Sequence, residues 1–246
     1  MTIPDRRTPH CYVINLRRRP DRRERMTSSL PSVLPVSFTS DWHGPFDGRR
    51  LTTQGFTTSG CELFPWQIDS SNPWWSRPLK YGEIGCALSH LRCWQDIVQT
   101  GTSTAIILED DVVLPPWFLP RLVGEMPAAL PHCDLLYLGR VPQAPDRGHV
   151  NGFAVPGYSH CTYGYMLTQH AAQHLVAAGL DKALIPVDEF LPAMYINHPR
   201  DDVRSCFPPR LRALAFEPAL VHQLPKHVAG SDTEDSEFVS ERPSVG

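Results

Sequence analysis

Three consecutive carboxylates, Glu109, Asp110 and Asp111, interrupt an otherwise apolar stretch of the chain. The residues before them, 104–108, are mostly apolar and β-prone, and residues 112–114 return to valine and leucine. Apolar flanks predict a buried strand, so we expect the acids to lie where that strand leaves the core. Like charges packed this closely repel unless a cation or hydrogen-bond donors offset them. Such a turn suits Mg²⁺ or Mn²⁺ and leaves coordination positions for phosphate oxygens of a substrate, the alternative being a solvated acidic turn.

The elements that must position this turn follow from the hydrophobic pattern around it. In the segment 82–100 the larger apolar residues recur with helical spacing, and Gly101 provides a stop signal. This pattern predicts a helix that leads directly into the strand at 104–108, a step typical of parallel α/β units. Further strands are expected at 11–16, 35–39, 134–138 and 160–167, and further helices at 21–30, 116–130 and 169–178.

Composition excludes several classes of protein. The 246 residues carry a formal net charge of −3, so no overall basic field attracts nucleic acid or anionic lipid. Seven cysteines without a CxxC pair argue against a disulfide framework and against a zinc ribbon. The first residues lack an apolar signal segment, and no apolar run approaches the length of a membrane span. We therefore expect no transmembrane segment, no nucleic-acid partner and a cytoplasmic location.

The sequence predicts one domain, with a less regular loop inside it and less regular segments at both ends. We expect a polar leader at 1–10, a single domain at 11–225 and an acidic, flexible tail at 226–246. Within the domain, residues 41–80 contain four tryptophans and many helix and strand breakers, without sustained periodicity. Such a loop either covers a pocket or binds an acceptor, or it simply packs its tryptophans onto the core.

Six segments, taken in order, resemble glycosyltransferase family 25, which includes bacterial lipopolysaccharide galactosyltransferases and collagen-modifying galactosyltransferases. They are VINLRRRPDRRERM, GEIGCALSHLRCW, ILEDDV, DLLYLG, GYMLTQHAAQHL and PVDEFL, which together span most of the chain. The ordered set is much more specific than an isolated acidic triplet. The resemblance implies an α/β fold of GT-A type, a nucleotide-sugar-binding sandwich with a mostly parallel central sheet.

The resemblance also implies how the acidic turn works. Glu109 and Asp111 would hold Mn²⁺ or Mg²⁺ against the diphosphate of a UDP-sugar, where the ion offsets charge on the leaving group. His222, in a late strand, is a candidate third metal ligand, although a single histidine is more often structural. The expected nucleotide-sugar-binding residues are Asn15, Arg17, Arg19, Arg22, Glu83, Ser89, His90 and Asp110.

The arginines after the first strand have a second interpretation. They either bind phosphate or ribose, or they form a solvated basic helix face, which is the better interpretation for Arg18, Arg23 and Arg25. Arg17 stands where many family members carry an acidic or small residue, so the nucleotide contacts there depart from the family pattern.

Family 25 enzymes are described as inverting, which implies a single displacement with a carboxylate that deprotonates the acceptor hydroxyl. This base must come from another segment, since metal-bound acids are already neutralised. Asp188 and Glu189 in PVDEFL are the candidates, with Asp188 preferred. The competing interpretation is that both acids merely stabilise the start of a helix.

The sequence thus predicts a metal-dependent inverting glycosyltransferase that moves a hexose, expected to be galactose from UDP-galactose, to a hydroxyl of a saccharide or hydroxylated peptide. One alternative is a metal-dependent phosphohydrolase, which needs a second ligand cluster; only scattered candidates such as His198, Asp201 and Asp202 exist. The other alternative is a non-catalytic binding module, because fold does not fix function.

Overall fold

Side chains along strand β3 (Thr104–Glu109) alternate between two hydrophobic cores, as the two-residue repeat of a strand requires. Ile107 packs into one core, whereas Ile106 and Leu108 pack into the other. The same alternation holds along the neighbouring strand β1 (His10–Ile14). The sheet is therefore covered on both faces, as expected for an α/β sandwich.

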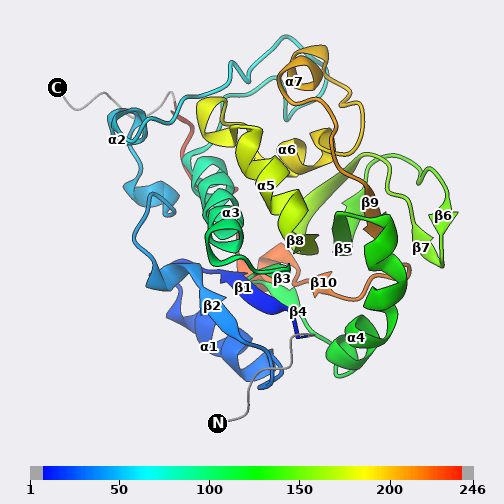
Figure 1. The fold of residues 1–246 in the computed structure, drawn as a ribbon. Helices are drawn as coiled ribbons and strands as arrows, with labels where there is room; N and C mark the ends of the chain where they lie inside the picture. Colours follow the sequence, from blue (N-terminus) through cyan, green and yellow to red (C-terminus); the bar gives the residue numbers. More distant parts are fainter. Residues whose placement is uncertain (1–7, 240–246) are drawn as a thin grey trace.

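The computed structural model describes residues 8–239 of the chain (Figure 1). Its remaining strands are β2 (Val36–Phe38), β4 (Val112–Val113), β5 (Leu135–Pro142), β6 (His149–Val150), β7 (Phe153–Ala154), β8 (Ser159–Thr168), β9 (Ala213–Ala215) and β10 (His222–Gln223). Its helices are α1 (Pro20–Ser29), α2 (Thr53–Thr58), α3 (Tyr81–Thr100), α4 (Phe118–Ala129), α5 (Gln169–Ala177), α6 (Val187–Ala193), α7 (Asp201–Cys206) and α8 (Lys226–Ala229).

The main sheet has the strand order β2-β1-β3-β8-β5-β9-β7-β6. β1 pairs in parallel with β2 and β3, and β5 pairs in parallel with β9. The other neighbours are antiparallel, because β8 runs against β3 and β5 while β7 runs against β9 and β6. The predicted α/β class is confirmed. The sheet is mixed rather than mostly parallel, since β8 enters its centre in the reverse direction.

Helices cover the two faces of the sheet unequally. α3 and α5 pack side by side over one face (Figure 1), where α3, α5 and α6 contribute to the larger core. Met26 of α1 and Leu122 of α4 belong to the core on the opposite face. Within the described part of the chain, no helix is both long and apolar enough to cross a membrane.

The helix predicted at 82–100 is confirmed as α3. Its first turn is capped by the carboxylate of Glu83, which accepts a hydrogen bond from the backbone N–H of Lys80 at 2.8 Å. It ends at Gly101, whose φ of 70° lies in the left-handed region that glycine adopts without steric cost. The loop that follows is short, so α3 delivers the chain directly into β3 and then into the acidic turn.

The Trp-rich segment 41–80 contains α2 and a 3-10 turn at Gly48–Arg50, but it is otherwise irregular. Trp66 is buried, and its ring N–H donates a hydrogen bond to the backbone oxygen of Trp74 at 3.0 Å. Trp66 thus anchors the loop to the larger core, against which Trp42 and Trp75 also pack.

The described part of the expected tail, 226–239, packs against the rest of the domain instead of extending from it. Ser236 accepts a hydrogen bond from the backbone N–H of Gly82 at 2.8 Å, and Phe238 forms an isolated bridge with Lys80. A side chain at Gly82 would start 2.7 Å from the backbone oxygen of Asp232, so only glycine permits this approach. The rest of the expected tail, 240–246, and the expected leader up to residue 7 lie outside the described residues.

Candidate functional site

A cavity lies at the carboxyl ends of the parallel strands β1 and β3, where ligand sites of α/β sheets commonly form. α3, α6 and the segment 226–239 close its other sides. The acidic side chains that line it come from four segments: Glu83, Glu109, Asp110, Asp111, Asp188, Asp232 and Glu234. Arg22 and Lys226 are the basic side chains of the described residues in this lining.

The middle acid of the triplet, Asp110, is held by protein groups. It is buried, and it accepts hydrogen bonds from Arg22 Nη1 and from Asn15 Nδ2, each at 2.7 Å. Burial raises the pKa of Asp110, and the Arg22 guanidinium opposes that shift. Asp110 therefore ties α1 and β1 to the end of β3, and both of its oxygens are already engaged.

The two outer acids have few donors. Asp111 accepts one hydrogen bond, from Gln223 Nε2 at 3.0 Å, and its buried Oδ1 has no partner among the described residues. Glu109 accepts one from the Thr162 hydroxyl at 3.1 Å. Burial and neighbouring carboxylates raise the pKa of Glu109 to about 8 and the pKa of Asp111 to about 7.

These two carboxylates fit a hard divalent cation. Within residues 8–239 no lysine or arginine forms a salt bridge with either one, so the charge of both carboxylates is poorly offset by the protein. Oxygen donors of this type are the ligands that Mg²⁺ and Mn²⁺ prefer. The unpartnered Oδ1 of Asp111 provides an available lone pair in the cavity wall.

Asp188, at the start of α6, also faces the cavity. Its Oδ1 accepts a hydrogen bond from the backbone N–H of Thr162 at 2.8 Å, and burial raises its pKa. Thr162 thus contacts two acids, since its hydroxyl bonds Glu109 and its N–H bonds Asp188. Thr162 could not be selected from the sequence, because a threonine within a strand is common.

Glu189 points away from the cavity into a buried polar cluster. It accepts hydrogen bonds from Tyr158 at 2.6 Å, from His198 at 2.8 Å and from Trp75 at 3.2 Å. Burial acts to raise the pKa of Glu189, but hydrogen bonds from His160, His198 and Tyr158 outweigh it and hold the pKa well below its ordinary value. The structure therefore separates the two predicted bases, with Asp188 in the cavity and Glu189 outside it.

The candidate metal ligand His222 is exposed and does not line the cavity. It pairs with Val113 in the small sheet of β4 and β10, and the next residue, Gln223, contacts Asp111 instead. Successive side chains of a strand face opposite sides, so only one of the two can reach the acids. The side chain that reaches the acidic turn is therefore Gln223, the neighbour of the predicted ligand His222.

The arginines after β1 mainly bind other protein segments. Arg17 is exposed and donates to the backbone oxygen of Ser40 at 3.0 Å, away from the cavity. Arg19 donates to Asp232 at 2.8 Å, and Arg18 donates to the other oxygen of the same carboxylate at 2.5 Å. The Asp232 carboxylate thus occupies the position next to these guanidinium groups that an anion would take.

Three further predicted residues belong to α3. Glu83 lines the cavity but pairs with Arg77 at 2.5 Å, and the hydroxyl of Ser89 donates to the backbone oxygen of Gly85. His90 is fully buried, with Nδ1 2.7 Å from the Tyr165 hydroxyl. Its Nε2 lies 3.5 Å from Glu109 Oε1. Glu83, Ser89 and His90 therefore surround the acidic turn, but each already contacts protein groups.

The structure also brings residues to the cavity that the sequence did not single out. Trp74 lines it with 41% of its surface exposed, and the guanidinium of Arg77 lies 4.7 Å from the centre of its ring. Cys86 and Cys161 line it as well. The four tryptophans of segment 41–80 were the sequence feature that could have pointed to Trp74. The two cysteines could not be distinguished from ordinary core residues.

The chain is similar in sequence to known proteins. Residues 8–125 match the family described as glycosyltransferase family 25 (LPS biosynthesis protein). Procollagen galactosyltransferase 1 of Danio rerio is 36% identical over 239 residues, which cover 92% of this chain and 38% of that protein. A probable inactive glycosyltransferase 25 family member 3 of Bos taurus is 37% identical over 238 residues, covering 94% of this chain and 38% of its own length.

A glycosyltransferase 25 family member of Aedes aegypti is 35% identical over 240 residues, covering 92% of this chain and 38% of that protein. The chain therefore spans about two fifths of the length of these curated relatives. Relatives named as galactosyltransferases and relatives named as inactive are similar to it to the same degree. The ordered motifs, the α/β sandwich and these similarities lead to one conclusion: the chain belongs to glycosyltransferase family 25.

Proposed function

We propose that this chain is a metal-dependent inverting glycosyltransferase that moves a hexosyl group, galactose from UDP-galactose, to a hydroxyl of a saccharide or hydroxylated peptide. The observation that carries the proposal is the meeting of Glu109, Asp111 and Asp188, from two separate segments, in one cavity. All three have raised pKa values, which indicates a site short of positive charge. A cation bound to a sugar diphosphate supplies that charge.

Glu109 and Asp111 would hold the divalent ion, Mn²⁺ or Mg²⁺. When bound, the ion stabilises the negative charge that develops on the diphosphate leaving group. Gln223 orients Asp111 by donating to its Oδ2, and Thr162 orients Glu109 through its hydroxyl. Asp110 takes no part in binding the ion, because Arg22 and Asn15 already engage its carboxylate.

Asp188 would act as the general base. Its raised pKa makes it a stronger proton acceptor than an ordinary carboxylate, which suits the removal of a proton from a hydroxyl near neutral pH. The Thr162 N–H fixes one oxygen of Asp188 and leaves the other for the acceptor hydroxyl. Trp74, exposed at the same cavity, offers an aromatic face on which an acceptor sugar or peptide side chain can stack.

Overall identity does not show whether this chain is active, because relatives named as inactive and a named galactosyltransferase are equally similar to it. The residues of the site must therefore decide between an active and an inactive protein. This chain keeps acids in all three roles proposed here. Burying poorly paired carboxylates costs stability, so a binding module without catalysis has little reason to keep them. The retained acids therefore favour an active enzyme over a non-catalytic module.

The phosphohydrolase alternative receives less support. His198 bonds Glu189, and Asp201 and Asp202 pair with Arg204 and Arg200. In the part of the chain that the structure describes, these candidates therefore form no second metal cluster beside the cavity. A two-metal hydrolase needs such a cluster.

The test is isothermal titration of the whole chain with UDP, with and without Mn²⁺, for the wild type and for Asp111→Asn. We expect UDP to bind the wild type only when Mn²⁺ is present, and Asp111→Asn to weaken this binding by about 100-fold or more. Asp202→Asn serves as the matched control, since Asp202 lies outside the cavity and pairs with Arg200.

Transfer is then measured with UDP-galactose and either a saccharide or a hydroxylated peptide. UDP binding that is equally strong without metal and in Asp111→Asn would contradict the metal assignment. Absence of UDP binding under both conditions would remove the nucleotide-sugar proposal altogether.

A further inference from the structure

Three side chains with different donor atoms meet beside the cavity: Cys86 and Glu109, which line it, and the fully buried His90. Their ligand atoms all lie within 4.8 Å of one another. Cys86 and His90 are four residues apart on α3 and therefore project from the same face of the helix, and Glu109 ends β3 opposite them. We call these three residues the Cys–His–Glu cluster.

The imidazole of His90 provides the second observation. His90 is fully buried, yet its Nε2 has no hydrogen-bond partner among the described residues and lies 3.5 Å from Glu109 Oε1. Two ligands on one tetrahedral zinc ion are separated by about 3.4 Å, given bonds of about 2.0–2.1 Å. The His90 and Glu109 atoms therefore already have the spacing of two zinc ligands.

The other nitrogen of His90 is positioned by its neighbours. Nδ1 lies 2.7 Å from the Tyr165 hydroxyl, which also accepts a hydrogen bond from Trp94 Nε1 at 3.0 Å. The bond between Nδ1 and the Tyr165 hydroxyl can form in either direction. Zinc binding would select the tautomer with the proton on Nδ1, in which the lone pair of Nε2 faces Glu109. A histidine whose second nitrogen is fixed in this way is typical of metal ligands.

We propose that the Cys–His–Glu cluster binds one Zn²⁺ ion, at a site that shares Glu109 with the proposed Glu109–Asp111 site but does not include Asp111. Thiolate, imidazole and carboxylate form a donor set that suits zinc, whereas Mg²⁺ prefers oxygen ligands alone. On binding, a Zn–S bond and a Zn–O bond form, and the thiol proton of Cys86 and, below about pH 8, the carboxyl proton of Glu109 are released to solvent. The charges of the thiolate and of the Glu109 carboxylate then balance the charge of the ion.

Zinc binding here does not depend on the proposed transferase activity, but it has a consequence for that activity. Glu109 belongs to the cluster and also lies beside Asp111 in the acidic turn. A zinc ion in the cluster therefore competes for Glu109 with the hard cation proposed above, and we expect Zn²⁺ to inhibit the enzyme.

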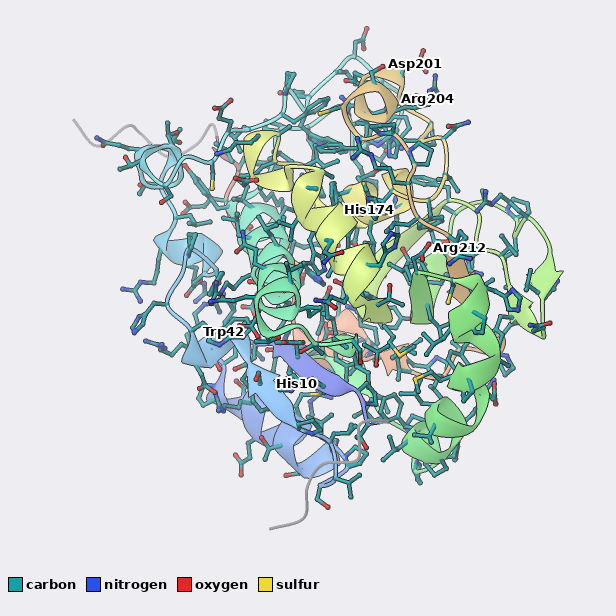
Figure 2. All side chains as sticks on the ribbon, in the orientation of Figure 1. His10, Trp42, His174, Asp201, Arg204 and Arg212 are labelled. Atoms are coloured by element: carbon teal, nitrogen blue, oxygen red, sulfur yellow. The ribbon has the colours of Figure 1, made fainter. Side chains whose placement is uncertain are left out.

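The experiment uses the whole chain, freed of metals, in a His174→Gln background. His174 lies on α5 (Figure 2), and its Nε2 is 3.1 Å from Nε2 of His170, so this exposed pair would bind zinc by itself. Zinc affinity is measured by competition with a chromogenic chelator. Co²⁺ is then added in place of zinc, because a cobalt–thiolate bond gives a charge-transfer absorption band in the near ultraviolet.

We expect one Zn²⁺ per chain, a cobalt–thiolate band, and a loss of zinc affinity of about tenfold or more in Cys86→Ser, with loss of the band. Cys161→Ser is the matched control, because Cys161 lines the same cavity but is not in the cluster. It should keep both the affinity and the band. Cys86→Ala and thermal melts of each variant separate loss of a ligand from loss of the fold.

Two results would overturn the proposal: absence of stoichiometric Zn²⁺ binding, or a cobalt–thiolate band that survives in Cys86→Ser and disappears in Cys161→Ser. Asp111→Asn distinguishes this site from the proposed catalytic one. It should leave zinc affinity within about threefold while abolishing Mn²⁺-dependent UDP binding, whereas equal loss of both would mean that a single site binds both ions.

Discussion

Asp188 and Glu189 are consecutive residues of α6 with opposite surroundings. Asp188 faces the cavity with the Thr162 N–H as its hydrogen-bond donor, and burial raises its pKa. Glu189 faces a cluster in which Tyr158, His198 and Trp75 donate to it, and its pKa falls despite burial. Supply of donors, more than depth of burial, separates a carboxylate available for chemistry from one that holds the structure together.

The same difference separates the cavity from the rest of the molecule. Glu109 and Asp111 resemble Asp188, because each accepts a single protein hydrogen bond and each has a raised pKa. Poorly satisfied acids of this kind cluster at functional sites. Substitutions should therefore affect activity on one side of α6 and stability on the other.

The largest effect is expected for Asp188→Asn. Asparagine can still accept the hydrogen bond from Thr162 but cannot take a proton, so kcat should fall by about 10²–10⁴-fold. Binding of UDP with Mn²⁺ should change by less than about threefold, since Asp188 is not a proposed metal ligand. Steady-state transfer assays and UDP titration measure the two quantities. A kcat that stays within about threefold of the wild type would exclude Asp188 as the base.

Glu189→Gln should reverse this pattern. Its amide cannot satisfy the donors of Tyr158, His198 and Trp75, so we expect the free energy of unfolding to drop by about 2–4 kcal/mol. Urea unfolding measures the change, and Asp202→Asn, which breaks a more exposed pair with Arg200, should cost less than about 1 kcal/mol. If Glu189→Gln is as stable as the wild type and loses only kcat, the roles of the two acids must be exchanged.

The pH dependence of stability should distinguish the cavity acids from Glu189. The pKa values of Glu109 and Asp111 are about 8 and 7 in the folded chain, above the ordinary values of 4.5 and 3.8. The protonated carboxyl groups of Glu109 and Asp111 therefore contribute to folding stability. This contribution is fully present below about pH 4 and is lost as the pH rises through 7 and 8. We expect the Tm of the metal-free chain to fall by about 5 °C between pH 6 and 8.5.

Mn²⁺ should remove most of the fall in Tm between pH 6 and 8.5, because the ion offsets the charge of the ionised Glu109 and Asp111. The difference in Tm between wild type and Asp111→Asn cancels the titration of groups elsewhere, such as His160, whose pKa is raised. Identical pH profiles for the two proteins, with and without Mn²⁺, would contradict the raised pKa of Asp111.

The smallest effect, a change in UDP binding, is expected for a substitution of Asp232. This residue lines the cavity, but like Glu189 it accepts several hydrogen bonds, in this case from Arg18 and Arg19. Burial acts to raise its pKa, yet Arg18 and Arg19 together hold it below its ordinary value. Asp232→Asn removes a negative charge that competes with a diphosphate for these guanidinium groups, so UDP should bind about two- to fivefold more tightly. Titration at two salt concentrations tests this, and weaker binding would mean that Asp232 assists the nucleotide.

Part of this arrangement was predictable from sequence. α3 and β3 have regular periodicity and clear end signals, so the helix, the strand and the acidic turn lie where they were predicted. The direction of β8 was not predictable, because strand pairing depends on contacts between distant segments. Asp188 and Glu189 both suit the first turn of a helix, and only tertiary packing determines which one faces the cavity.

Two other differences between the predicted and the observed structure also arise from contacts between distant segments. His222 and Gln223 lie in a strand of two residues, too short for alternation to be recognised, so the side chain that reaches Asp111 could not be selected. The segment 226–239 is polar and acidic, which is typical of disorder, but the arginines after β1 and the glycine at 82 give it a place to dock.

The irregularity in β8 has a consequence for the reaction. Pairing with β5 shifts register between Gly139 and Val141, and Cys161 has a φ of 66°, in the left-handed region. Thr162 follows at once, with its N–H on Asp188 and its hydroxyl on Glu109. If Asp188 is the base and Glu109 binds the cation, as proposed above, this irregular stretch of β8 sets the distance between the acceptor oxygen and the diphosphate.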